Sequence, residues 1–391
     1  MRRRFAAIRL MGLVLGLLLA AVPLAAYALA QEGFESKAPH AILIDARTGR
    51  VLFEKGADEA VPPASMSKLM TMIMVFEALK AEKLSLDQEI LISEDAWKRG
   101  GASSGGSTMY AELNSKVRLE DLIKGVVVQS ANDACIAIAE AMSGSEASFS
   151  QQMTERAKEL GASNATFRNA TGLPDPEHRM SVRDLSTLAR HVINDFPEYY
   201  KYYSIPEFTW NKIKQSNRNP LLKDYPGADG MKTGYTREAG YGLVGSAIRD
   251  GRRLIMVIAG LKSINERKQE AQSLLDWGFK QFRPVEVYAK GDRVGSARVW
   301  GGASRSVGLV TSEPVRVALS AEEQDIAEMK LAYEGPLMAP VEAGTRVGSV
   351  RFIVDGLTVA DVPVQTAEPV EVEPSMWSRA FDSVFIMAFG S

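Results

Sequence analysis

The sequence predicts an α+β fold followed by a smaller all-β domain. Segments of β type occur within residues 41–54 and again within 230–260, and helical patterns lie between them. This order favours an antiparallel sheet with a helical cluster over alternating βαβ units. From residue 284 to about residue 370, short alternating segments with glycine-bearing turns replace the helices. That change is typical of a small all-β sandwich.

Length and composition set the first limits on function. The chain has 391 residues, of which 46% are hydrophobic and 24% are charged. It is therefore long enough for two domains and a sizeable core. The formal net charge is -2, so the chain lacks the basic excess that a nucleic-acid-binding protein usually carries.

The first thirty residues have the pattern of an export signal. Four arginines within residues 2–9 precede an apolar stretch from Leu10 to Leu24, and Ala28-Leu29-Ala30 follows. A basic segment, a short apolar segment and a small-x-small site predict a signal peptide over residues 1–30 that is removed. Its removal takes the side-chain net charge from -2 to -6. The alternative is an uncleaved membrane anchor, for which the apolar segment is short.

Hydrophobic periodicity and turn residues predict the elements of residues 31–283. In chain order they are a hairpin of strands 41–45 and 50–54, a helix at 69–76, helices within 117–142, 150–160 and 180–193, strands at 230–235, 241–246 and 254–260, and a helix at 266–282. An irregular stretch separates the first helix from the second. Its Gly/Ser run at 100–107 has no Gly-Lys-[Ser/Thr] ending and no preceding strand, so a surface or site-covering loop is favoured over a phosphate loop.

The rest of the chain divides into two further parts. We expect an all-β domain over residues 284–370, with alternating segments at 293–299, 315–319 and 350–354. The tail, residues 371–391, shows helical spacing with apolar and polar faces. It is too short and too amphipathic to span a bilayer. We expect an interfacial membrane helix; the alternative is a helix docked on its own protein.

Ser65 opens the stretch around which a functional prediction can be built. Pro62 and Pro63 hold the approach extended, and an apolar run from Leu69 follows. A serine at the first turn of a buried helix lies among free backbone N–H groups. Lys68 is one turn away, so its amine can reach the hydroxyl. Such a pair suits an acyl-transfer nucleophile, although an N-capping serine with an unrelated lysine is the commoner arrangement.

A second polar interruption, Gln129–Asp133, lies between two helical patterns. It either caps the second helix or presents side chains to a cleft, and capping is favoured when the stretch is taken alone.

Cysteine and histidine are scarce. Cys135 is the only cysteine, so an exported protein of this sequence has no internal disulfide. The three histidines, His40, His178 and His191, form no His-Glu-x-x-His motif, and none accompanies a Gly-x-Ser-x-Gly elbow. We therefore predict no metal site and no cofactor.

Three motifs then occur in one order. Ser65-x-x-Lys68 is followed by Ser130-Ala131-Asn132 and by Lys232-Thr233-Gly234. They resemble the Ser-x-x-Lys, Ser-x-Asn and Lys-Thr-Gly motifs of the penicillin-recognising serine enzymes. Their surroundings are similar to the low-molecular-mass penicillin-binding proteins, and specifically to the serine D-alanyl-D-alanine carboxypeptidases, over nearly the whole mature chain. The resemblance implies a β-lactamase/transpeptidase-like catalytic domain.

The resemblance also implies a nucleophile and its base. Ser65 attacks the carbonyl of the penultimate D-alanine and forms an acyl-enzyme. Lys68 must be neutral to accept the serine proton, although a free lysine titrates near ~10.4. Burial and a nearby cation both lower such a pKa. Lys232 is the expected cation and the main reason for Lys68 to lose its proton.

The remaining site residues bind substrate or move its proton. Ser130 relays a proton to the leaving amine, and Asn132 holds the substrate's backbone amide with both its donor and its acceptor. Lys232 and Thr233 suit the terminal carboxylate. Gly234 lets the substrate lie along the strand. By resemblance, the oxyanion hole consists of the backbone N–H groups of Ser65 and Tyr235.

Some residues depart from the family's pattern. Ala131 stands where glycine is common, and Tyr235 stands where histidine is common. Lys262 lies near the place of an arginine that helps to bind carboxylate in some relatives. Arg218 matches a family position, and we assign it a supporting electrostatic role.

The leading hypothesis is a serine D,D-carboxypeptidase that trims peptidoglycan stem peptides ending in D-Ala-D-Ala and is acylated by β-lactams. We expect export to the periplasmic face of the cytoplasmic membrane, with peripheral attachment through the tail. The alternatives are a class A-like β-lactamase, for which Glu177 would be the deacylating glutamate, a D,D-endopeptidase, and a catalytically silent cell-wall-binding protein.

Overall fold

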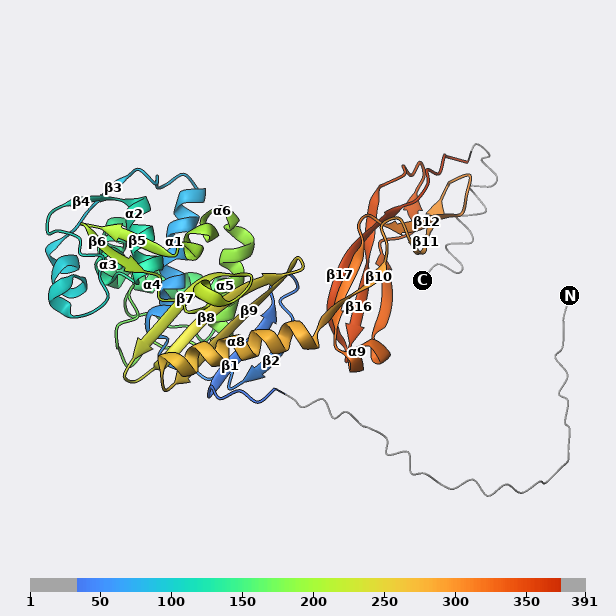
Figure 1. Ribbon diagram of the computed structural model, residues 1–391. Coiled ribbons are helices and arrows are strands. Elements are labelled where there is room, and N and C mark those ends of the chain that lie inside the picture. The colour runs from blue at the N-terminus through green and yellow to red at the C-terminus, as the bar shows by residue number, and fades with distance from the viewer. Residues whose placement is uncertain (1–33, 374–391) are drawn as a thin grey trace, which may run out of the picture. The chain divides into compact units, whose positions relative to one another are not determined.

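The computed structural model describes residues 34–373 (Figure 1). The predicted signal peptide, and the predicted tail from residue 374 onward, lie outside the described residues.

Residues 34–282 form a mixed region of strands and helices, ordered as follows: β1 (His40–Asp45), β2 (Val51–Lys55), η1 (Ala64–Ser67), α1 (Lys68–Lys80), β3 (Glu89–Leu91), η2 (Ala96–Gly100), η3 (Ala102–Ser104), β4 (Lys116–Arg118), α2 (Leu119–Lys124), η4 (Gly125–Gln129), α3 (Asn132–Ser143), α4 (Glu146–Glu159), α5 (Val182–Asp195), α6 (Pro197–Tyr200), η5 (Lys201–Ser204), β5 (Glu207–Trp210), β6 (Ile213–Ser216), α7 (Leu221–Asp224), β7 (Ala228–Thr236), β8 (Gly240–Arg249), β9 (Arg252–Leu261) and α8 (Ile264–Gln281).

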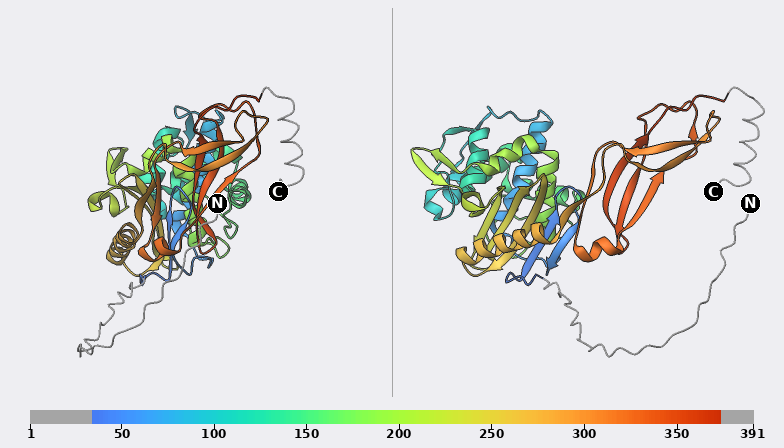
Figure 2. Two further views of the ribbon diagram at one scale, coloured as in Figure 1. Left: turned by 90° about the vertical axis from the view of Figure 1, so that its right-hand side faces the viewer. Right: turned by 45° about the vertical axis from the view of Figure 1, so that its right-hand side comes forward.

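Five of these strands form one antiparallel sheet in the order β2-β1-β9-β8-β7. Both faces of this sheet are covered (Figures 1 and 2). Helix α8 runs along one face, and α5 and the helical cluster cover the other. Strand β7 lies at the edge of the sheet, so one side of it is available for the site described below.

The sequence of β9 shows why the sheet is buried on both sides. Its alternate residues point to opposite faces. Ile255 and Val257 join the core formed with the helical cluster, while Met256 and Ile258 join the core under α8. A strand that packs on both faces reads as a continuous apolar run rather than as alternating polar and apolar residues.

The predicted α+β fold is confirmed, with local differences. The stretch predicted as helical from residue 117 begins as a short strand, β4, and its first helix ends in the wide turn η4. The preference for Gln129–Asp133 as a cap was wrong, because Ala131 occupies the N-cap position of α3 and no side chain caps that helix. Ser130 instead adopts φ +61, a left-handed conformation at the end of η4.

Residues 283–373 form the β-rich part of the chain. Its elements are β10 (Arg283–Tyr288), β11 (Arg293–Trp300), β12 (Ser306–Thr311), β13 (Val315–Leu319), α9 (Ala321–Ile326), β14 (Glu328–Tyr333), β15 (Leu337–Met338), β16 (Arg346–Val354) and β17 (Leu357–Thr366). A two-stranded sheet, β10-β13, accompanies a six-stranded sheet in the order β14-β16-β17-β12-β11-β15. Alternate valines on the facing strands build a separate core, as expected of an all-β domain.

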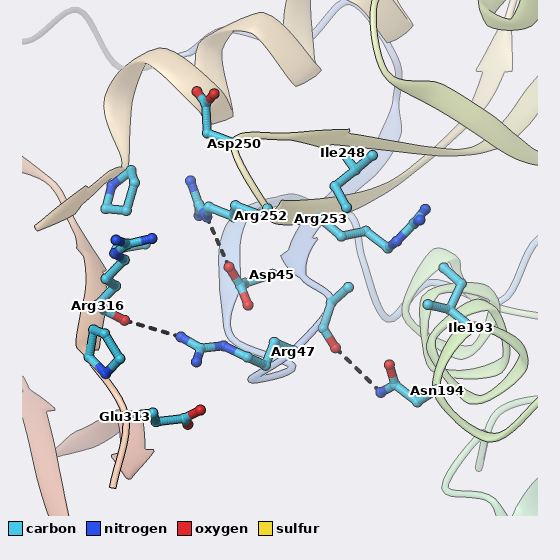
Figure 3. Close-up of a pocket in the computed structure, with 15 residues that line it drawn as sticks. Asp45, Arg47, Ile193, Asn194, Ile248, Asp250, Arg252, Arg253, Glu313 and Arg316 are labelled. Carbon is cyan, nitrogen blue, oxygen red and sulfur yellow. Dashed lines mark hydrogen bonds and ion pairs between the residues drawn. The ribbon is translucent and has the colours of Figure 1, made fainter. Parts of the chain in front are cut away.

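A cavity of about 610 Å³ lies beside the loop that follows β1 (Figure 3). In it, Arg252 pairs with Asp45 at 3.0 Å, and Arg47 donates to the backbone carbonyl of Arg316 at 3.1 Å. None of the eight predicted site residues lines this cavity. Four of these residues, Lys232 to Tyr235, lie on β7 instead.

Candidate active site

Ser65 lies in the tight turn η1, immediately before the buried helix α1. The turn is strained, because Ala64 has φ +48, a left-handed conformation that a side chain disfavours. Gly172 packs so closely against it that a Cβ there would lie 2.0 Å from the Ala64 carbonyl oxygen. Strained backbone of this kind is concentrated at functional sites, and here it presents the Ser65 hydroxyl.

Lys68 is fully buried and makes three polar contacts. Its Nζ lies 2.9 Å from the Ser65 Oγ and 2.9 Å from the Asn132 Oδ1, and it also contacts the backbone carbonyl of Thr171. Two of these partners are carbonyl oxygens, which only accept hydrogen bonds. A neutral amine therefore donates its two hydrogens to them and keeps its lone pair for the Ser65 hydroxyl.

The Thr171 carbonyl was not predicted from the sequence. Its loop is held by the Asn169 side chain, whose oxygen accepts from the backbone N–H groups of Thr171 and Gly172. Glu146 accepts from the N–H of Ala170 at 3.0 Å and pairs with Arg99 at 2.7 Å. The only signal in the sequence was the turn chemistry of Asn-x-Thr-Gly.

Lys232 comes from the middle of β7 and is also buried. Its Nζ lies 2.9 Å from the Ser130 Oγ and 3.0 Å from the carbonyl of Thr233. The second and third motifs therefore meet directly. The first and second meet through Lys68 and Asn132.

The electrostatics differ in one respect from the prediction. Burial lowers the pKa of Lys68 to about 8, and among nearby cations Arg218 lowers it further. Burial and the Lys68 charge lower the pKa of Lys232 well below its usual range. Lys232 was predicted to be the main cause for Lys68, whereas burial is the largest cause. Because the two amines are coupled, the proton lost first belongs to the pair.

Gly234 brings β7 against the nucleophile turn. A Cβ at this position would lie 2.9 Å from the Pro63 carbonyl oxygen and 3.0 Å from the Met66 Cγ. These distances are shorter than side chains tolerate, so the glycine is required for close packing of β7 on η1. From the sequence, Gly234 was expected only to let the substrate lie along the strand.

Thr233 and Tyr235 flank this glycine on β7. Thr233 is nearly buried, whereas Tyr235 is 54% exposed. The Tyr235 ring stacks on Tyr241 of β8, with ring centroids 4.2 Å apart. Four of the five residues predicted for substrate binding thus lie on the edge strand β7, and the fifth, Asn132, lies at the start of α3.

The loop at residues 107–111 is hydrogen-bonded to Asp133, the residue that follows the second motif. The Asp133 carboxylate accepts from the Thr108 hydroxyl and from the backbone N–H groups of Met109 and Ala111. Arg218 donates to the Ser107 hydroxyl at 2.5 Å, so this supporting cation contacts the same loop. Asp133 was not predicted as a site residue. Its carboxylate binds the loop rather than another motif, and such a contact between distant residues leaves no pattern in the sequence.

Other chemistries find no support in these residues. Glu177, the candidate for a class A-type deacylating glutamate, has a side chain that is 71% exposed and pairs with Arg168 at 3.1 Å. Within residues 34–373, no three His, Cys, Asp or Glu side chains gather in a way that could hold a metal ion. Cys135 is buried, and burial raises the pKa of its thiol to about 12.

Comparisons with known proteins agree with this geometry. The D-alanyl-D-alanine carboxypeptidase family (peptidase S11) matches residues 26–263, and the C-terminal domain of penicillin-binding protein 5 matches residues 282–372. The chain is 39% identical over 358 residues to D-alanyl-D-alanine carboxypeptidase DacC of Escherichia coli, an alignment that covers 90% of this chain and 89% of the relative.

Solved structures extend the likeness to the fold. Penicillin-binding protein 5 of Haemophilus influenzae is 35% identical and superposes with a TM-score of 0.73, covering 87% of this chain and 99% of that one. Penicillin-binding protein D2 of Listeria monocytogenes, in its ampicillin-bound form, is 31% identical with a TM-score of 0.55, covering 63% of this chain and 99% of that one. The chain therefore belongs to the D-alanyl-D-alanine carboxypeptidase family.

Proposed function

We propose that the protein removes the terminal D-alanine from peptidoglycan stem peptides through an acyl-enzyme on Ser65. The observation that carries this proposal is the position of the Lys68 amine, 2.9 Å from the Ser65 Oγ in a buried site. A buried lysine with a pKa of about 8 is a competent general base near neutral pH.

Acylation begins when Ser65 gives its proton to Lys68 and attacks the carbonyl of the penultimate D-alanine. The backbone N–H groups of Ser65 and Tyr235 are the proposed donors to the oxyanion. Ser130, which the Lys232 amine contacts, passes a proton to the leaving D-alanine amine. Water then hydrolyses the ester and releases the shortened peptide.

The substrate's own charge helps to set the protonation states. Lys232 and Thr233 are the proposed partners of its terminal carboxylate. An anion beside Lys232 raises the pKa of this lysine. The single proton that the coupled pair retains then settles on Lys232, which leaves Lys68 neutral for the serine. Substrate binding and base activation are thus the same event.

The same site explains β-lactam acylation. A β-lactam presents a reactive carbonyl and a carboxylate in the place of the D-Ala-D-Ala end. Support comes from the ampicillin-bound form of penicillin-binding protein D2, whose fold this chain shares. We propose β-lactams as covalent inhibitors that form the corresponding ester on Ser65.

A decisive assay incubates the purified protein with diacetyl-L-Lys-D-Ala-D-Ala and measures released D-alanine. Release from the wild type and its loss in Ser65→Ala would support the proposal. Ser143→Ala is the matched control, because Ser143 ends helix α3 and its hydroxyl donates to Gln152 at 3.0 Å rather than to a motif residue. Release that persists in Ser65→Ala refutes the mechanism. Absence of release from wild type, with slow β-lactam labelling, would favour a catalytically silent wall-binding protein.

We also propose that the protein acts at the periplasmic face of the cytoplasmic membrane and attaches through its tail. The relatives are D-alanyl-D-alanine carboxypeptidases by name, and the amphipathic pattern of the tail suits an interfacial helix. Within residues 34–373, no helix is long and apolar enough to cross a membrane. Truncation before Pro374 should free the protein from membranes without loss of activity; unchanged sedimentation with membranes would refute the attachment.

A further inference from the structure

The turn that joins β7 to β8 lies at the end of the strand that is proposed to receive the substrate. Thr236 and Gly240 are the last pair of the two strands, and the Thr236 hydroxyl accepts a hydrogen bond from the Ala239 N–H at 3.0 Å. Gly240 has φ +68, a left-handed conformation that is typical of a three-residue hairpin loop. The backbone of residues 237–239 is therefore held in one conformation beyond the edge of β7.

The acid of this turn already has a cationic partner. The Glu238 carboxylate pairs with Arg179 at 3.0 Å. Arg179 belongs to the loop that follows Gly172, where the chain packs against the nucleophile turn η1. Glu177, the exposed acid of the same loop, pairs with Arg168 at 3.1 Å. The exposed carboxylates at this end of β7 are thus compensated by arginines of the loop.

Arg237 is the first residue of the turn and has no such partner. It is exposed, and within residues 34–373 its side chain makes no hydrogen bond and no ion pair. Its neighbour Glu238 is not available to it, because that carboxylate binds Arg179. A guanidinium presents five N–H donors in a planar fork that matches a carboxylate. The turn therefore offers an uncommitted carboxylate-binding group.

The proposed contacts of the substrate set the direction in which it lies along β7. Its terminal carboxylate is assigned to Lys232 and Thr233, and the carbonyl of the penultimate D-alanine to the N–H of Tyr235. The peptide therefore runs antiparallel to β7, and the residues before its D-Ala-D-Ala end lie beyond Tyr235. Extended chains advance by about 3.3 Å per residue, so Arg237 is roughly 7 Å past Tyr235, beside these upstream residues.

The upstream part of a stem peptide carries negative charge. Its second residue is a γ-linked D-glutamate with a free α-carboxylate. Its third residue adds a further carboxylate where it is meso-diaminopimelate. Lys232 and Thr233 are engaged by the terminal carboxylate, so an upstream anion requires another cation. Diacetyl-L-Lys-D-Ala-D-Ala has neither of these upstream carboxylates and cannot make that contact.

We propose that Arg237 binds an upstream carboxylate of the stem peptide and so gives the enzyme a preference for long, acidic stem peptides. The inference rests on the proposed D,D-carboxypeptidase function and deepens it by adding a second point of attachment for the substrate. A penicillin mimics the D-Ala-D-Ala end and lacks the second and third stem residues. Its acylation of Ser65 therefore does not depend on Arg237.

The test measures how well a peptide protects the protein from labelling by a fluorescent penicillin, at low salt because salt screens an exposed ion pair. The probe is N-acetyl-L-Ala-γ-D-Glu-L-Lys(Nε-acetyl)-D-Ala-D-Ala, compared with the same peptide in which D-isoglutamine turns the α-carboxylate into an amide. In the wild type, the acid should protect at about fivefold lower concentration, the upper scale of an exposed ion pair. Arg237→Gln should abolish this preference, and Arg237→Lys should retain part of it.

A second pair of peptides locates the carboxylate. Both carry D-isoglutamine at the second position, and the third position is meso-diaminopimelate or its side-chain carboxamide. A preference for the acid in this pair that Arg237→Gln abolishes would assign the contact to the third residue. The corresponding loss in the first pair alone would assign it to the second residue. A wild type without a preference in either pair would overturn the proposal.

Lys212 provides a charge-matched control. It is an exposed cation in the turn between β5 and β6, and Lys212→Gln changes the net charge by the same amount. This variant should keep the wild-type preference. An equal loss in Lys212→Gln, or a full preference in Arg237→Gln, would refute the assignment. The rate of penicillin acylation and the protection by diacetyl-L-Lys-D-Ala-D-Ala should stay within about twofold of wild type in Arg237→Gln, as expected of an exposed position.

This readout is independent of turnover. A wild type that releases no D-alanine but prefers the acidic peptide in the protection assay would contradict the proposed function alone. A wild type that releases D-alanine while Arg237→Gln keeps the full preference would contradict this inference alone.

Discussion

The Asn132 Oδ1 accepts a hydrogen bond from the Lys68 Nζ at 2.9 Å. This contact fixes the orientation of the amide, because only its oxygen can accept. The Nδ2 group is then the donor that can bind substrate. It lies close to Gly106, at which a Cβ would be 3.0 Å from the Nδ2. We therefore propose that Asn132 donates to a carbonyl of the peptide. From the sequence we expect both its donor and its acceptor to bind substrate, whereas in the structure its acceptor binds Lys68.

This relationship makes Asn132→Asp informative. A carboxylate in place of the amide would hold Lys68 in its charged form, because an adjacent anion raises the pKa of a lysine. In the wild type, the acylation rate should rise about tenfold between pH 7 and pH 9, as a base with a pKa of about 8 loses its proton. In Asn132→Asp, acylation by a fluorescent penicillin at pH 7 should fall at least about tenfold, and its rise should move to higher pH. A profile that keeps its midpoint near 8 would show that Lys68 is not the base.

Glu146 should support acylation from a distance. It holds the backbone of Ala170, whose neighbour Thr171 supplies a carbonyl to Lys68. Glu146→Ala leaves Arg99 without this partner, and we expect it to cost about 2 kcal/mol of stability. We also expect acylation to slow about tenfold. Glu146→Gln keeps an acceptor for the Ala170 N–H and should retain most of the rate. Equal rates in both variants would show that the loop does not control Lys68.

A second hydrogen-bond network holds the start of β7 in place. Arg253 makes a bidentate pair with Asp229, with both contacts at 2.6 Å, and donates to the Ser246 hydroxyl at 2.7 Å. This joins the three strands β7, β8 and β9 three residues before Lys232. Arg253→Lys cannot form the fork, so kcat should fall about tenfold. The preference for diacetyl-L-Lys-D-Ala-D-Ala over the same peptide ending in a carboxamide, measured as protection from penicillin labelling, should be kept, because Arg253→Lys leaves Lys232 and Thr233, the proposed partners of the carboxylate, unchanged. A large loss of that preference would contradict this assignment.

His178 should make stability depend on pH. It is buried, its Nδ1 accepts from the Arg168 N–H at 3.4 Å, and its Nε2 has no hydrogen-bond partner among residues 34–373. Burial lowers its pKa to about 4. Because the folded pKa is below the unfolded value near ~6.5, the stabilisation is fully present above pH ~6.5 and is lost as the pH falls toward 4.

The loss can be measured by urea unfolding. Between pH 7.5 and pH 5, the wild type should lose about 2 kcal/mol more stability than His178→Asn. Asparagine retains an acceptor for the Arg168 N–H but does not titrate in this range. Parallel pH dependence in the two proteins would rule out His178 as the cause.

Glu177→Gln separates this protein from a class A β-lactamase. The Glu177 side chain is exposed and pairs with a surface arginine, and a surface pair contributes at most about 1 kcal/mol. We therefore expect the half-life of the penicilloyl-enzyme and the carboxypeptidase rate to stay within about twofold of wild type. A large increase in acyl-enzyme lifetime would revive the β-lactamase alternative.

The motif residues could be found from the sequence because each combines a reactive group with a local pattern. Ser65 and Lys68 are one helical turn apart, and the glycine after Thr233 marks a strand edge with close neighbours. The α+β arrangement followed from the order of periodic segments. The apolar run of β9 predicted a strand, and its burial on both faces was found only in the structure.

Other parts depend on contacts between distant residues, which no local pattern reports. The Thr171 carbonyl is a backbone atom, so no residue type indicates its role. Asp133 looks like an ordinary first-turn acid of α3 until the loop at Thr108 is folded onto it. Ser130 resembled a cap because serine favours that position, but in its left-handed conformation its hydroxyl accepts from Lys232.

Strand β7 is the last strand of the sheet. Its free edge can bind a peptide substrate and a β-lactam to different extents. A free strand edge offers a row of backbone groups to any extended chain. A long stem peptide can pair with several of them, whereas a bicyclic antibiotic spans about one dipeptide. Mutations along this edge can therefore weaken cell-wall trimming without an equal change in antibiotic capture.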